Sequence, residues 1–219
     1  MPRLLFEKTG KAVWISHLDL MRVFQRAFKR ADLPLTHTHG FNPRPSVSIA
    51  LPLTVGVHSK CELLDFALAV EGVSCDEIKA RLNDVLIEGI TVLGVYDGGR
   101  KIRDLMLLEC NITLEYGTSV PVDAKDRITA LFNQNEVIVP KKTKNGMQDQ
   151  NIVTMIRRLH IDKVEEKALN INCLICCQNP TLNPAQIILA ITKYLPMYEP
   201  VHTVYSRLEV YDNSNTVFR

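Results

Sequence analysis

The 219-residue sequence lacks long hydrophobic runs, and no uninterrupted apolar stretch exceeds five residues, as at residues 66–70. A membrane-spanning helix needs about 20 such residues, so the sequence predicts no transmembrane segment. Near the start only three apolar residues follow one another before a charge, too few for the core of a secretory signal peptide. We therefore expect a cytoplasmic protein.

Cysteine is also scarce, because six residues in 219 are too few for a disulfide scaffold. Cys173 and Cys176 have the spacing of half a zinc site, but no second pair of this kind exists. In a strand these two side chains would face opposite sides. We interpret them, with Cys177, as buried free thiols and expect no metal site.

Motifs that mark a bound cofactor are missing from the sequence. It contains no cysteine motif of a radical-SAM iron–sulfur cluster, no Walker A loop, no G-x-G-x-x-G fingerprint and no G-x-S-x-G elbow. The sequence therefore predicts no cofactor.

The net charge of +2 is unevenly distributed. Residues 1–45 hold eight Lys and Arg residues against three Asp and Glu residues, so this segment carries +5 and the remainder −3. Three of the six histidines, His17, His37 and His39, lie in the same segment. This asymmetry predicts a surface that faces a polyanion. The alternative is a solvated basic face without a partner.

Two stretches of similar order flank the turn Asp97-Gly98-Gly99. In the first half, hydrophobic periodicity predicts strands at 3–9, 47–51, 63–70 and 90–96 and helices at 17–31 and 75–85. In the second half it predicts strands at 105–116, 137–139, 169–177 and 201–211, helices at 123–132 and 184–194, a basic loop at 141–146 and a helical turn at 153–159. Both halves fit the order β-α-β-β-α-β, so we expect an α+β protein of two tandem ferredoxin-like domains, 1–98 and 99–219, with an insertion around 141–160.

The first predicted helix is amphipathic. Ser16 is a good N-cap, and Asp19 three residues later forms the acidic variant of a capping box. On the face opposite the apolar residues, Arg22, Arg26 and Arg30 recur at helical spacing. The stripe could bind phosphate, or its members could pair locally, as Asp19 with Arg22. His17, in the first turn, is a candidate base or simply polar surface.

A proline-rich segment follows this helix. Asn42 and Arg44 each precede a proline, which favours extended backbone at both positions. Arg44 is thereby held between two rigid residues and could present its planar guanidinium to a phosphate or carboxylate. Phe41 could stack on a base, and His37 and His39 lie in the same segment. A purely structural connector is the alternative.

Two motifs in these segments carry a family resemblance. Ser-His-Leu-Asp at 16–19 and Gly-Phe-Asn-Pro-Arg-Pro at 40–45 resemble the radical-SAM-linked family of domains of unknown function. The resemblance covers the first 70 residues closely and the rest more loosely. It implies a bacterial cytoplasmic protein encoded beside, or fused to, a cobalamin-binding radical-SAM enzyme, and it implies no known reaction.

Three functions remain open on this basis. The leading hypothesis is an accessory RNA-binding module that presents tRNA or rRNA to a radical-SAM partner. Its RNA- or partner-binding residues would be Asp19, Arg22, Arg26, Arg30, Phe41, Asn42 and Arg44. The second is a metal-independent ribonuclease with His17 and either His37 or His39 as base and acid. The third is a protein-interaction subunit of the radical-SAM enzyme that makes no nucleic-acid contact.

One structural expectation separates these hypotheses. If the protein acts on RNA through one cleft, the histidines, Asp19, Arg22 and Arg44 should line it together. If these residues are scattered, both nucleic-acid hypotheses become weaker.

Overall fold

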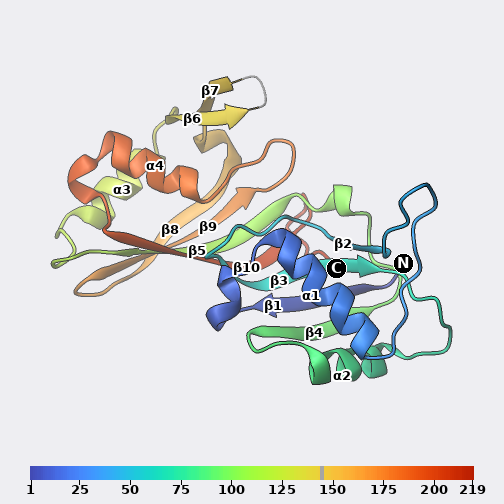
Figure 1. Cartoon of the computed structure of the whole chain (residues 1–219). Helices are drawn as coiled ribbons and strands as arrows, with labels where there is room; N and C mark the ends of the chain where they lie inside the picture. The colour runs from blue at the N-terminus through green and yellow to red at the C-terminus, as the bar shows by residue number, and fades with distance from the viewer. Residues whose placement is uncertain (144–145) are drawn as a thin grey trace. The chain divides into compact units, whose positions relative to one another are not determined.

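The computed structural model describes residues 1–143 and 146–219 (Figure 1). These residues form an α+β protein with four α-helices. The chain divides into two compact units, one of residues 1–102 with Phe218–Arg219 (unit 1) and the other of Arg103–Val217 (unit 2). Within the described part, no helix is both long and apolar enough to cross a membrane.

Unit 1 is an antiparallel sheet with two helices. Its elements are β1 (Arg3–Lys8), the 3-10 helix η1 (Gly10–Trp14), α1 (His17–Arg30), β2 (Val47–Ile49), β3 (His58–Phe66), α2 (Cys75–Val85) and β4 (Ile90–Tyr96). The strands are arranged in the order β4-β1-β3-β2, and each neighbouring pair is antiparallel. Helix α2 and strand β4 have the bounds that the sequence predicts, whereas β3 begins five residues earlier than predicted.

Helix α1 begins and packs as its sequence pattern predicts. The Ser16 hydroxyl accepts a hydrogen bond from the Asp19 backbone N–H at 3.2 Å, which confirms the predicted N-cap. On the buried face, the Phe24 ring meets Phe6 of β1 edge-on, with 4.7 Å between the ring centroids. Phe28 lies one turn further along and is fully buried. This packing anchors α1 on the sheet and leaves its opposite face exposed.

Unit 2 has the same order of principal elements, interrupted by a hairpin. Its elements are η2 (Ile102–Asp104, which begins at the last residue of unit 1), β5 (Leu107–Glu115), α3 (Ala124–Phe132), β6 (Ile138–Thr143), β7 (Gly146–Asn151), η3 (Val153–Met155), β8 (Ile156–Val164), β9 (Ala168–Cys176), α4 (Ala185–Tyr194), η4 (Pro196–Tyr198) and β10 (His202–Tyr211). The main sheet has the order β10-β5-β9-β8 with antiparallel pairs, and β6 pairs only with β7.

Two predictions for unit 2 are wrong. The expected basic loop at 141–146 is part of a hairpin, since Lys141 and Lys142 lie in β6; Lys144 is outside the described residues. The expected helical turn at 153–159 is present only over Val153–Met155, because β8 begins at Ile156. β8 is the edge strand of this sheet and is largely exposed. It therefore lacks the apolar alternation by which a half-buried strand is detected.

The cysteines of unit 2 are free and mostly buried. Cys173 lies directly opposite Cys110 in the β5–β9 ladder, and their Sγ atoms are 3.2 Å apart. The interaction with the Cys110 thiol, together with burial, raises the pKa of Cys173 well above its ordinary value. Burial raises the pKa of Cys177 to about 12. These thiols are therefore held in the neutral, weakly nucleophilic form.

Candidate nucleic-acid interface

The geometry of the interface starts with a buried lysine. Lys8, the last residue of β1, is fully buried, and its Nζ donates hydrogen bonds to the carbonyl oxygens of Val13 at 3.2 Å and Ile15 at 2.7 Å. Val13 lies in η1 and Ile15 in the link between η1 and α1, so both carbonyls belong to the segment of residues 10–16 that leads from the sheet to the helix. Lys8 therefore sets where this segment leaves the sheet and where helix α1 starts.

Three exposed apolar side chains, which we call the apolar patch, belong to the segment held by Lys8 and to its neighbours: Trp14 in η1, Leu18 in the first turn of α1, and Val55, which precedes the Gly56 that packs against the Trp14 ring. Trp14 is 70% exposed and Leu18 is 69% exposed. The Trp14 ring packs beside Gly56, whose backbone has φ +84° and whose N–H donates to Val13. The sequence analysis missed Trp14, because a lone aromatic residue outside any periodic pattern does not reveal which way it faces.

His17 is the first residue of α1 and lies next to this patch. Its Nδ1 atom is buried and has no hydrogen-bond partner among residues 1–143 and 146–219. Two residues on, Asp19 accepts hydrogen bonds from the Ser16 hydroxyl at 2.7 Å and from the Arg22 guanidinium at 2.8 Å. These two bonds lower the pKa of the Asp19 carboxyl. The positive charge of Arg22 is therefore partly compensated in place.

The remaining cations of α1 differ in whether another residue already binds their charged group. Arg26 and Lys29 are exposed and have no partner in the part of the chain that the structure describes. Arg30 instead donates from Nη2 to the carbonyl oxygen of Val85 at 2.6 Å, and Val85 is the last residue of α2. Arg30 therefore joins the ends of the two helices, which is a structural role that its place in the sequence stripe does not reveal.

The segment 36–46 forms a closed, projecting loop. The Thr38 N–H donates to the Arg44 carbonyl at 2.8 Å, and the Arg44 N–H donates to the Thr38 hydroxyl at 3.0 Å. At the tip, Phe41 is fully solvent-exposed and Asn42 is exposed, after Gly40 at φ +133°. The Arg44 side chain is also exposed, and no described residue contacts its guanidinium in a hydrogen bond or ion pair. A rigid base therefore presents an aromatic ring, an amide and a cation.

The candidate site residues do not form one cleft. His17 follows the end of β1 that carries Lys8. The loop with His37 and His39 is hydrogen-bonded to Ala67, which directly follows β3. This end of β3 pairs with the start of β1. The two groups therefore leave opposite ends of a six-residue strand, which is about 20 Å long. The structure does not bring together the acid and base that the ribonuclease hypothesis requires, and the same scatter weakens the expectation that RNA binds in one cleft lined by all these residues.

The basic charge of residues 1–45 is also smaller at the surface than the sequence count suggests. Arg3 and Lys8 are buried, and the Arg3 Nε lies 2.6 Å from an Asp65 carboxylate oxygen. Arg22 is paired with Asp19, and Arg30 donates to the Val85 carbonyl oxygen. We define as the basic strip the four cations of this segment that are exposed and have no partner among the described residues: Lys11, Arg26, Lys29 and Arg44.

Comparison with solved structures finds similar folds at very low identity. A crystal structure of a Cbf5-Nop10-Gar1 complex matches with a TM-score of 0.53 and 10% identity, over 95% of this chain and 48% of that chain. A structure of an H/ACA RNP bound to a substrate RNA containing 2'-deoxyuridine matches with a TM-score of 0.49 and 8% identity, over 94% and 46%. The chain thus spans about half the length of these structures, and at this identity the likeness concerns the fold alone.

Sequence comparison places the chain in a family. Among curated proteins no sequence matches. A family model described as "uncharacterized protein conserved in bacteria (DUF2344)" covers residues 2–184. The chain therefore belongs to this bacterial family.

Proposed function

We propose that the protein is an accessory RNA-binding module of the cytoplasm, which presents tRNA or rRNA to a radical-SAM enzyme through unit 1. The observation that carries this proposal is the arrangement of the basic strip. Its unpartnered cations extend along α1 and into the 36–46 loop, and an exposed aromatic side chain lies at each end, Trp14 at one and Phe41 at the other. Aromatic platforms combined with cations are typical of surfaces that bind single-stranded nucleic acid.

The extended arrangement favours a single strand over a folded pocket ligand. Base stacking on an exposed ring contributes about 1–3 kcal/mol per base, irrespective of base identity. Arg26, Lys29 and Arg44 would contact phosphates, which sets position along the strand but carries no sequence information. Asn42, beside Phe41 at the loop tip, would hydrogen-bond the edge of the stacked base. Most of the affinity would therefore be electrostatic and sensitive to salt.

The fold positions the surface residues of the proposed site but does not by itself indicate RNA binding. In each unit the element order is β-α-β-β-α-β, apart from the inserted β6–β7 hairpin, and the strand order is fourth-first-third-second. We propose on these grounds that both units are ferredoxin-like domains. Because this fold serves many unrelated functions, the RNA-binding proposal depends on the surface residues of unit 1.

The test compares two double variants that remove the same charge. Arg26→Ala/Arg44→Ala removes two members of the basic strip, and Lys60→Ala/Lys101→Ala removes two exposed cations elsewhere in unit 1. Fluorescence anisotropy with a labelled single-stranded RNA is measured from low to physiological salt. We expect the first variant to lose at least tenfold in affinity at low salt and its salt slope to fall by about 1.4, since each phosphate contact on a single strand contributes about 0.7.

Phe41→Ala supplies a second readout that is independent of charge. We expect it to weaken binding by roughly fivefold or more without changing the salt slope, because it removes a stacking surface. Absence of RNA binding by the wild type at low salt would refute the proposal. So would equal losses in the two double variants.

A second candidate function rests on the apolar patch. Trp14, Leu18 and Val55 are all exposed, and clustered apolar side chains at a surface also mark protein interfaces. This patch supports the alternative of a protein-interaction subunit that docks the radical-SAM enzyme without contacting RNA. Co-purification that survives nuclease and is lost in Leu18→Arg or Asp19→Arg, while RNA binding is absent, would favour this alternative.

A further inference from the structure

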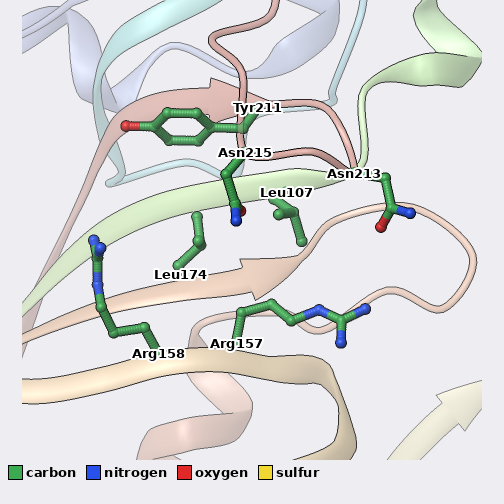
Figure 2. A pocket seen from close by; sticks show the side chains of 7 residues that line it. All are labelled: Leu107, Arg157, Arg158, Leu174, Tyr211, Asn213 and Asn215. Carbon is green, nitrogen blue, oxygen red and sulfur yellow. The ribbon is translucent and has the colours of Figure 1, made fainter.

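Unit 2 contains a pocket that lies outside the basic strip and the apolar patch. Its volume is about 740 Å³, within the range of small-molecule sites. The lining residues come from four strands and the turn after β10: Leu107, Arg157, Arg158, Leu174, Tyr211, Asn213 and Asn215. Figure 2 shows the two leucines between the arginines on one side and the tyrosine and asparagines on the other.

A β-bulge in β8 places two arginines in this pocket. Ile156 pairs with Ile175 and Arg158 pairs with Leu174, so Arg157 is an extra residue in the ladder. In a regular strand, adjacent side chains face opposite sides of the sheet. The bulge re-aims one of them, and both arginines line the same pocket.

The two arginines differ in charge compensation. Arg158 Nη2 donates to a Glu109 carboxylate oxygen at 2.8 Å, and the other oxygen of Glu109 accepts from the Tyr211 hydroxyl at 2.8 Å. Burial, reinforced by this bond, raises the pKa of Tyr211 to about 12, so the phenol stays neutral. Arg157 is exposed and is given no hydrogen-bond or ion-pair partner by the described residues. The lining of the pocket therefore includes one uncompensated cation and one neutral aromatic ring.

The turn after β10 holds the two asparagines in place. Asp212 Oδ1 accepts hydrogen bonds from the backbone N–H groups of Ser214 at 2.8 Å and Thr216 at 2.9 Å. Asn215 has φ +60°, a left-handed conformation that asparagine tolerates. Neither the Asn213 nor the Asn215 side-chain amide has a hydrogen-bond partner within the described ranges. Two amides are thus presented on a braced turn.

We propose that this pocket binds a nucleotide, either free or as one residue of an RNA strand. Leu107 and Leu174 line the pocket but are buried, so the half-buried Tyr211 ring offers the main apolar surface for a flat base. The two asparagine amides supply both donors and acceptors for the base edge or the ribose. The Arg157 guanidinium binds the phosphate, which it can contact with two parallel hydrogen bonds.

The test titrates the full chain with the four nucleoside 5′-monophosphates, and with the matching nucleosides, by calorimetry. A short single-stranded RNA forms the second arm. Arg157→Ala removes the free cation, Asn215→Gly removes one amide while keeping the left-handed backbone, and Arg103→Ala is the control. Arg103 is a highly exposed arginine of the same unit outside the pocket.

We expect at least one nucleotide, or the RNA, to bind tenfold or more weakly to Arg157→Ala and to lose less than twofold in Arg103→Ala. Binding of the mononucleotide would identify a free nucleotide as the source, and binding of the RNA alone would identify an RNA residue. The site would be overturned if neither ligand bound at millimolar concentration, if nucleosides bound as well as nucleotides, or if both arginine variants behaved alike. If no mononucleotide binds and RNA binding depends on Arg26 and Arg44 but not on Arg157, the pocket is overturned and the proposed function remains intact.

Discussion

Replacement of Lys8 by methionine tests how the segment between β1 and α1 is held in place. Methionine fills a similar volume but cannot donate hydrogen bonds. The substitution therefore leaves the Val13 and Ile15 carbonyl oxygens without the donor that they share. Lys11→Met is the matched control, because Lys11 belongs to the same segment but is exposed and has no partner in the described part of the chain.

The expected cost follows from the buried carbonyls. A buried acceptor that loses its hydrogen bond costs about 1–3 kcal/mol. The Val13 carbonyl still accepts from the Gly56 N–H, so the main loss falls on the Ile15 carbonyl, and we take the upper end of the range, about 3 kcal/mol. The desolvation cost of the lysine charge disappears in the variant and offsets part of this loss. A buried carboxylate, Glu62, nevertheless lies on the strand paired with β1, so removing the cation leaves negative charge in the same sheet. We keep about 3 kcal/mol as the expected destabilisation.

Urea unfolding measures this effect with two probes. Far-ultraviolet circular dichroism follows both units, whereas fluorescence follows unit 1, since Trp14 is the single tryptophan of the chain. With an m value of about 1.5 kcal/mol per molar urea, a loss of 3 kcal/mol lowers the midpoint of the fluorescence transition by about 2 M. Acrylamide quenching of Trp14 in the native state reports whether its segment has also loosened.

The reasoning fails on either of two results. A shift below about 0.5 M in Lys8→Met would mean that water or a rearranged backbone satisfies the two carbonyls. Equal shifts in Lys8→Met and Lys11→Met would mean that loss of charge, and not loss of the buried hydrogen bonds, determines the stability.

Three other predictions concern the cap, the core and the thiols. Ser16→Ala should destabilise unit 1 by about 1 kcal/mol. It should also raise the Asp19 pKa towards its ordinary value, which NMR titration measures. In the wild type, the stabilisation by this carboxylate should be lost as the pH falls through its lowered pKa. Phe24→Ala should cost about 3–5 kcal/mol in urea unfolding, whereas the fully exposed Phe41→Ala should change stability by less than about 0.5 kcal/mol; similar losses would contradict the burial difference. Cys173 should resist alkylation in the native protein and react in urea, and mass spectrometry showing rapid native labelling would refute its burial and raised pKa.

Regular elements with a buried face were predictable, because their apolar residues repeat at the period of the helix or strand. Helix α2 has its predicted bounds because Ser74 caps it and the residues that pack inward recur at helical spacing. The missed strands β7 and β8 are mainly polar and exposed. Their structure depends on pairing with a partner strand, which local periodicity does not encode.

The candidate site was predictable only in part. The sequence predicted that Arg44 is rigidly presented, because the flanking prolines restrict the backbone wherever the loop lies. It named Phe41 only as a side chain that could stack on a base. It did not reveal that Arg30 is used to join two helices or that Lys8 is buried. Both outcomes depend on carbonyl groups that the fold brings next to these cations.

By itself, the sequence determined the element order of unit 1, the cap and buried face of α1, and the concentration of basic residues before residue 46, since all of these are local properties. Only the tertiary structure decided which cations are left without a partner and that His17 lies far from His37 and His39. It also decided that a bulge directs the Arg157 side chain towards a pocket. Availability, distance and side-chain direction are set by strand register and by contacts between residues far apart in the chain, and these depend on how the whole sheet assembles.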